Sequence, residues 1–214
     1  MTLAFRDRAH AGRVLAERLD EYHSDPNALV LALPRGGVPV GFEVARHLHV
    51  PLDVFVVRKL GVPGREELAM GAIASGGARV LNDDVIGHLA IAPDIVQEVA
   101  KRESREVERR EAEYRGNRPR LNVHNRILIL VDDGLATGST MRAALAALRP
   151  QHPRAIVVAV PVAAAPTRDE FRRLADQVIC VAAPDGFSSV SQWYDDFSQT
   201  TDDEVRRLLA KAAQ

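Results

Sequence analysis

Short apolar runs recur along the chain, separated by segments in which apolar residues have helical spacing. The runs cover residues 28–33, 52–57, 127–131, 156–162 and 178–181. Continuous rather than alternating runs are typical of strands buried on both faces of a parallel sheet. Helical spacing occurs over residues 5–21, 38–48, 139–148, 166–175 and 201–209. This order predicts an α/β fold, with an open, mostly parallel, twisted sheet and helices on both faces.

Three segments depart from this alternation. Residues 71–75 and 79–82 predict a short hairpin around Gly76–Gly77. Residues 94–115 predict a highly charged helix, with acid-first pairs four residues apart at Glu98/Arg102, Glu106/Arg110 and Glu111/Arg115. That helix either leans on the domain or a second subunit, or lines an anion site with its arginines. Residues 184–199 are rich in Ser, Asp and aromatic side chains.

Length and charge limit the function classes. The 214 residues show no internal repeat or low-complexity linker, so we expect one domain over residues 1–214 with a charged helical insertion at about 93–116. The 28 basic and 29 acidic side chains give a formal net charge of -1, which favours neither nucleic acid nor an anionic membrane as partner.

The location of the protein is also an expectation from sequence. No apolar run approaches the roughly 18 residues of a membrane span, and charges interrupt the N-terminal segment where a signal peptide is apolar. The single cysteine, Cys180, lies in an apolar run and has no internal disulfide partner. We therefore expect a cytoplasmic protein without a membrane anchor.

Residues 127–141 carry the clearest chemical signal. A buried strand ends at two adjacent acids, Asp132 and Asp133, and a small-residue loop leads into a helix. Ligands bind at this edge of open α/β sheets. The N–H groups of the first helical turn would cradle a phosphate, with close backbone approach at a glycine and help from hydroxyls, at Thr137, Gly138, Ser139 and Thr140.

The two acids suit hydroxyl groups or a hydrated cation rather than the phosphate itself. A phosphate at one end of a short molecule and a diol at the other describe a ribose 5-phosphate. The chain has neither the Gly-x-Gly-x-x-Gly dinucleotide fingerprint nor a P-loop.

The stretch from Ile127 to Met141 resembles the phosphoribosyl diphosphate (PRPP) signature of the type I phosphoribosyltransferases. The resemblance implies transfer of 5-phosphoribosyl from PRPP to a nitrogenous base, with release of pyrophosphate and a role in nucleotide salvage. It implies Asp132 and Asp133 as catalytic residues that hold Mg²⁺, directly or through water, and a homodimer. Gly134 and Ala136 would line the substrate site with the loop hydroxyls.

Other segments match the rest of that family pattern. Arg35, Gly36 and Gly37 resemble the loop that receives the pyrophosphate. Arg58 would bind substrate and Lys59 would be catalytic, at the root of a mobile lid over residues 58–71. A C-terminal hood, at about residues 184–200, would select the base, with Phe187 stacking on it.

Two departures from the pattern leave the catalytic base open. Ala136 stands where the hypoxanthine/guanine branch has an aspartate that deprotonates the purine, and Gly134 replaces a bulkier residue. Either a lid glutamate, Glu66 or Glu67, acts as general base, with Glu67 chosen here, or the substrate needs none. A non-catalytic regulator that binds PRPP or a nucleotide is the main alternative to the transferase, and a hydrolase or phosphorylase acting on a phosphoribosyl compound is a third.

Overall fold

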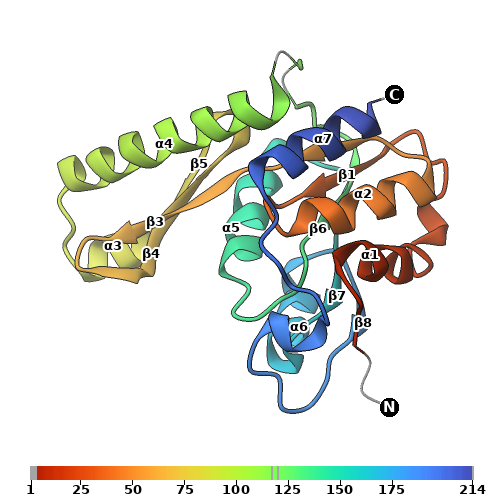
Figure 1. The fold of residues 1–214 in the computed structure, drawn as a ribbon. Helices are drawn as coiled ribbons and strands as arrows, with labels where there is room; N and C mark the ends of the chain where they lie inside the picture. Colours follow the sequence, from red (N-terminus) through yellow and green to blue (C-terminus); the bar gives the residue numbers. More distant parts are fainter. Residues whose placement is uncertain (1–3, 117, 120, 214) are drawn as a thin grey trace.

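The computed structural model describes residues 4–116, 118–119 and 121–213, with Glu67 described by its backbone alone. Its centre is a five-stranded parallel sheet in the order β2-β1-β6-β7-β8 (Figure 1). The strands are β1 Ala28–Ala32, β2 Leu52–Val54, β6 Ile127–Val131, β7 Ala155–Val162 and β8 Gln177–Ala182. The predicted parallel α/β fold is confirmed.

Helices cover both faces of this sheet, as predicted. On one face, side chains of β1 and β6 such as Val30 and Ile129 pack with helices α1 Arg8–Ala16, α2 Gly37–Leu48 and α7 Asp202–Ala212. On the other, Leu31 and Leu130 pack with α5 Ser139–Leu148 and α6 Ala165–Leu174. Every residue of β1 and β6 is buried, which explains their uninterrupted apolar sequence.

Residues 57–115 form a second unit, here called the arm, that projects from the sheet (Figure 1). It contains an antiparallel sheet of β3 Val57–Val62, β4 Arg65–Ala74 and β5 Ala78–Leu81, then helices α3 Asp83–His88 and α4 Pro93–Arg115. The hairpin around Gly76–Gly77 is confirmed, with Ala74 opposite Ala78.

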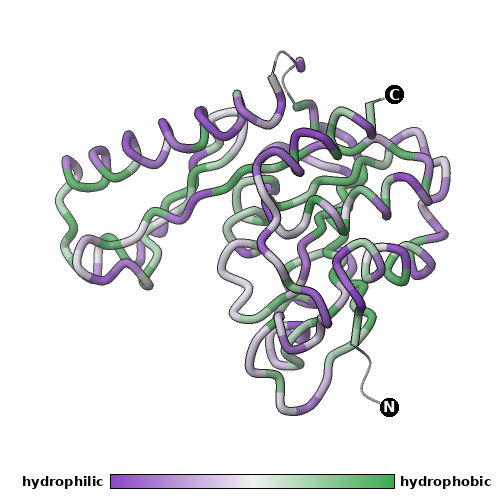
Figure 2. The backbone as a smooth tube through the Cα atoms, viewed as in Figure 1, coloured by the Kyte–Doolittle hydropathy of each residue, from purple (hydrophilic) through white to green (hydrophobic). Residues whose placement is uncertain are grey.

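Helix α4 lies along the arm sheet and presents a narrow apolar stripe to the molecule. Figure 2 shows this helix with hydrophilic colour on its outer side and hydrophobic colour on the side that faces the strands. The buried apolar residues are those that the spacing predicts: Val96, Val99, Ala100, Val107 and Tyr114.

Many charged side chains of α4 pair with one another along the helix. The predicted pairs Glu106/Arg110 and Glu111/Arg115 form, at 2.6 and 3.8 Å. Glu98/Arg102 was a wrong prediction, because Arg102 bonds the neighbouring Glu103 instead, at 3.0 Å.

Two local predictions were also wrong, and one helix was missed. The first helix covers residues 8–16 rather than 5–21, because the Asp7 side chain caps it and Phe5 pairs with Tyr194 instead. Residues 58–71, expected as a loop, belong to strands β3 and β4, which turn at Gly64, where φ is +75°. Helix α3 was not predicted. In the described part of the chain, no helix is both long and apolar enough to cross a membrane.

Candidate active site

Asp132 and Asp133 directly follow strand β6 at the carboxyl edge of the sheet. The Asp132 carboxylate accepts a hydrogen bond from the Asp133 backbone N–H at 2.9 Å. Asp133 accepts a bond at Oδ2 from Nε of Arg8, at 2.8 Å. Both acids therefore have fixed partners at the point where the sequence places a ligand.

The predicted pyrophosphate loop lies against these acids. It follows β1, the strand that pairs with β6, and a Cβ on Gly36 would collide with the Asp133 carboxylate. The Pro34–Arg35 peptide bond is cis, and Gly37 begins helix α2. Arg35 lies 3.7 Å from Asp202 at the start of α7. The structure thus brings Arg35, Gly36 and Gly37 to the same edge as the acids.

The loop after the acids ends at the amino terminus of α5. Gly138 has φ +70°, a backbone conformation that favours glycine, and a Cβ there would lie 2.5 Å from the Phe171 ring. Thr137, Ser139 and Thr140 are exposed around this turn, and the Thr137 and Ser139 hydroxyls lie 3.1 Å apart. Exposed hydroxyls beside the N–H groups of a helix start form an arrangement suited to a phosphate.

Helix α6 holds this loop in place. Thr167 donates a hydrogen bond to the carbonyl of Ala136 at 2.7 Å, and Arg142 of α5 pairs with Glu170 of α6 at 2.8 Å. Leu135 is hydrogen-bonded to the end of β7 through its N–H group. The loop is therefore fixed by the domain before any ligand binds.

Residues 184–200, the predicted hood, contact Asp133 and the residue that follows it. Val190 packs on Gly134, where a Cβ would lie 2.6 Å from Val190 Cγ1. This contact explains why the bulkier residue of the family pattern is replaced by glycine. The Tyr194 hydroxyl donates to the backbone carbonyl of Asp133 at 2.6 Å.

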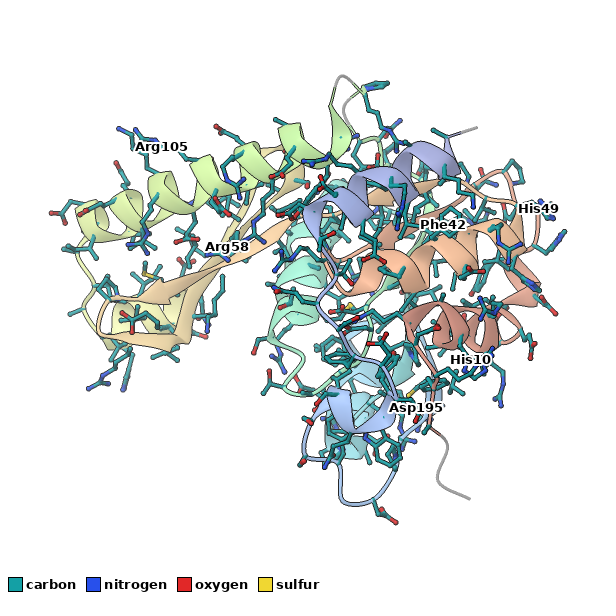
Figure 3. The ribbon with its side chains drawn as sticks, in the orientation of Figure 1. His10, Phe42, His49, Arg58, Arg105 and Asp195 are labelled. Atoms are coloured by element: carbon teal, nitrogen blue, oxygen red, sulfur yellow. The ribbon has the colours of Figure 1, made fainter. Side chains whose placement is uncertain are left out.

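The N-terminal segment closes the other side of the hood. Phe5 pairs with Tyr194 as an isolated parallel bridge, and the N–H group of Asp195 bonds the Phe5 carbonyl at 2.8 Å. Figure 3 labels Asp195 and, on α1, His10 near this junction. Arg8 donates from Nη1 to the Ser198 carbonyl at 2.7 Å.

Arg58 and Lys59 lie on opposite faces of β3 because side chains alternate along a strand. Arg58 points toward α4, where it pairs with the largely buried Glu103 at 2.9 Å (Figure 3). Lys59 lines a cleft of about 720 Å³ between the arm sheet and α5, with Ser139 and Arg142 on the opposite wall. The structure thus places Lys59 in a cleft that Ser139 also lines, and it gives Arg58 a partner within the arm.

The remaining predicted site residues are Glu66, Glu67 and Phe187. The Glu67 side chain lies outside the described part of the chain. Glu66 is exposed, and its pKa is lowered first by a hydrogen bond from its own backbone N–H group and then by one from the Gly64 N–H group. Phe187 is half-buried and packs in the apolar cluster of Phe5 and Tyr194.

Burial governs the electrostatics of the two acids. It raises the pKa of Asp132 well above the ordinary value, and the charge of Asp133 raises it further. Burial also raises the pKa of Asp133, while Arg8 acts in the opposite direction. Carboxylates in this setting gain most from positive charge placed beside them, such as a developing cationic sugar.

The donor set fits a magnesium ion that arrives with a substrate. Mg²⁺ is commonly held by one or two carboxylates together with substrate phosphates and water, and Asp132 and Asp133 would supply the carboxylates. Within the described ranges, no group of three or more His, Cys, Asp or Glu side chains is placed to hold a metal ion. A site built by the protein and its substrate together satisfies both observations.

Comparison with known proteins identifies the family. A family model described as phosphoribosyl transferase domain matches residues 5–196. The chain belongs to this family. The resemblance drawn from the motif after β6 is thereby confirmed, and the five-stranded parallel sheet of the phosphoribosyl transferase domain positions that motif at its carboxyl edge.

Two curated relatives and one solved structure resemble the chain over nearly all its length. "Putative phosphoribosyl transferase Rv0571c" and "Putative phosphoribosyl transferase MT0597", from two strains of Mycobacterium tuberculosis, are each 46% identical over 208 residues. That match covers 97% of the chain and 47% of each relative, so the chain spans about half their length. The crystal structure of TT1426 from Thermus thermophilus is 40% identical, with a TM-score of 0.87, covering 97% of this chain and 98% of that one.

Sequence reasoning missed Arg8 and the position of the Tyr194 hydroxyl. Arg8 is 125 residues from its partner Asp133, and no spacing rule connects a helix start to a distant strand end. The Tyr194 hydroxyl bonds the backbone carbonyl of Asp133, a contact that the aromatic-rich sequence around it does not indicate.

Proposed function

We propose that the domain transfers the 5-phosphoribosyl group of PRPP to a nitrogenous base and releases pyrophosphate. The observation that carries this proposal is the meeting of three parts at one sheet edge: the Asp132–Asp133 pair, the α5 amino terminus and the glycine loop after β1. Family membership over residues 5–196 supports the same chemistry.

Each part has a place in the reaction. The α5 amino terminus and its hydroxyls hold the 5-phosphate, the acids accept hydrogen bonds from the ribose hydroxyls, and the loop with Arg35 receives the pyrophosphate. The bond between the anomeric carbon and the pyrophosphate oxygen breaks, a carbon–nitrogen bond forms to the base, and the base loses a proton. Positive charge that develops on the sugar lies beside the acids.

Magnesium is the cofactor that this proposal requires. Asp132 and Asp133 would hold Mg²⁺, directly or through water, and the ion would supply positive charge that stabilises the leaving pyrophosphate. Lys59, on the cleft wall facing Ser139, supplies further positive charge. The arm, on which Lys59 lies, excludes water from the cationic sugar when it closes on the cleft. The proposal also includes a nitrogenous base as the acceptor and a homodimer as the oligomeric state.

The test measures pyrophosphate release and nucleotide mass with PRPP, Mg²⁺ and a panel of purine and pyrimidine bases. Nucleotide product should form with one base of the panel and only when Mg²⁺ is present, so chelation of the metal should abolish product formation. Asp132→Asn with Asp133→Asn should abolish turnover, while Asp94→Asn, an exposed acid on α4, serves as the matched control. Native turnover in the double variant would refute this assignment of the site.

Further arms separate the alternatives. Lys59→Gln should lower kcat by about ten- to a thousandfold, as loss of one stabilising charge does, whereas Lys101→Gln on α4 should have no effect. PRPP binding without turnover for every base would favour a regulator, and product formed without any base would favour a hydrolase. Light scattering during gel filtration tests the homodimer.

A further inference from the structure

Arg8 connects three parts of the molecule through one guanidinium group. Nε donates to Asp133 Oδ2 at 2.8 Å, and Nη1 donates to the Ser198 carbonyl at 2.7 Å. The guanidinium carbon lies 3.9 Å from the centre of the Phe197 ring. The fork geometry of arginine permits such simultaneous contacts, which lysine cannot reproduce.

The contact with Asp133 is largely shielded from solvent, whereas the contact with Ser198 lies at the exposed surface. The side chains of Arg8 and Asp133 are only 11% and 14% exposed. Arg8 is the first residue of α1, whose start is fixed by the Asp7 side chain, and Phe5 is tied to Tyr194 of the hood. The position of the guanidinium is therefore set by backbone structure on both sides.

The environment of Asp133 makes this contact specific. Asp132 is its acidic neighbour, Gly36 closes the side toward the pyrophosphate loop, and the Tyr194 hydroxyl bonds its backbone. Arg8 is the only positively charged side chain that the described residues bring into an ion pair with it.

We propose that Arg8 is a positioning residue for PRPP, which fixes the rotamer of Asp133 and couples that acid to the hood. Arg8 holds Oδ2, so a ribose hydroxyl is received by Oδ1. The inference rests on the proposed function, because it concerns how the same site holds the ribose. It differs from a purely structural role, in which Arg8 would only anchor the hood through Ser198 and Phe197.

A double-mutant cycle read by PRPP binding separates these two roles. Calorimetric titration of PRPP with Mg²⁺ is performed on the wild type, Arg8→Gln, Asp133→Asn and the double variant. Arg8→Gln should weaken PRPP binding by at least about tenfold, because it leaves a buried carboxylate without its partner. In the Asp133→Asn background the same substitution should change the affinity by less than about twofold, because the two residues act as a unit.

Matched variants control for charge and folding. Arg13→Gln removes a cation from the same helix, where it pairs with Glu43, and should leave PRPP affinity unchanged. Arg8→Lys keeps the charge without the fork and should bind PRPP with intermediate affinity. Circular dichroism melts identify any variant that fails to fold, and Arg8→Lys then carries the test in place of Arg8→Gln.

The outcomes distinguish the two levels of the proposal. If the wild type binds no PRPP, the proposed function fails, and the role of Arg8 fails with it. If the wild type binds PRPP and Arg8→Gln binds equally well, only the role of Arg8 is refuted. An equal loss of affinity from Arg8→Gln in both backgrounds, reproduced by Phe197→Leu, would assign Arg8 to hood anchoring and overturn the positioning role.

Discussion

The central sheet and the arm are built by different means. Strands β1 and β6 are buried on both faces and exclude water along their whole length. In the arm, β3 and β5 carry many partly exposed residues, and α4 is coated with ion pairs. The difference teaches that burial holds the central sheet, which carries the acids, in place. The arm, which carries Lys59, depends on contacts where it joins the central sheet, such as the Arg115–Asp53 pair.

The largest expected effect comes from making the same type of substitution, isoleucine to alanine, in each of the two regions. Ile129→Ala in β6 should destabilise the domain by about 4 kcal/mol, because it leaves a cavity between packed layers. Ile73→Ala in β4 should cost only about 2 kcal/mol, since the arm is thinner and can relax. Urea unfolding measures both, and equal losses would show that the arm is packed as tightly as the sheet.

The next effect concerns the anchor of α4. Arg115 pairs with Asp53 of β2 at 3.0 Å, and both side chains are nearly buried. Arg115→Gln should cost about 3 kcal/mol, because an unpaired carboxylate is left in a dry position. Hydrogen exchange should accelerate along α4 and not along β6. Uniform acceleration would mean that arm and sheet unfold as one unit.

A smaller, pH-dependent effect comes from Tyr114, whose hydroxyl bonds Asp202 of α7. Burial raises the pKa of Tyr114 from 10 to about 12, with the Asp202 bond adding to the shift. A raised folded pKa stabilises the fold below about pH 10, and this contribution is lost as pH rises through about 12. Tyr114→Phe should cost about 1 kcal/mol near neutral pH and nothing at the alkaline limit. Denaturant titrations across this range measure the difference, and a constant gap would contradict it.

The smallest effect is expected at the outer face of α4. Arg109 bridges Glu106 and Glu113, but its side chain is 58% exposed. Arg109→Gln should leave stability nearly unchanged, because solvent screens such pairs. A thermal melt suffices, and a loss near that of Arg115→Gln would show that the surface network, rather than the anchor, holds the arm.

The same contrast explains what the sequence could predict. The buried strands, most of their helices and the position of the motif at Asp132 were predicted correctly, because each depends on residues that are neighbours in sequence. The strand nature of residues 58–71 was missed, because Gly61 and the Pro63–Gly64 turn resemble a loop and the strand pairing involves a bulge. The Arg58–Glu103 pair depends on how α4 docks, which no local pattern contains.

The site itself was predicted in part for the same reason. The three loops that meet at the sheet edge carry local signatures, since glycines, acids and hydroxyls follow buried strands. Arg8 and Tyr194 carry none, because their role arises only when the two ends of the chain meet at Asp133.

The junction at Arg8 also has a consequence for the order of folding. Its contacts join residues 125 and 190 positions apart, so they close some of the longest loops in the chain. Closing such loops costs the most chain entropy and comes after local structure has formed. A nascent chain therefore carries both Arg8 and Asp133 long before residue 198 has left the ribosome, and the contact that ties Arg8 to the C-terminal segment is among the last to form.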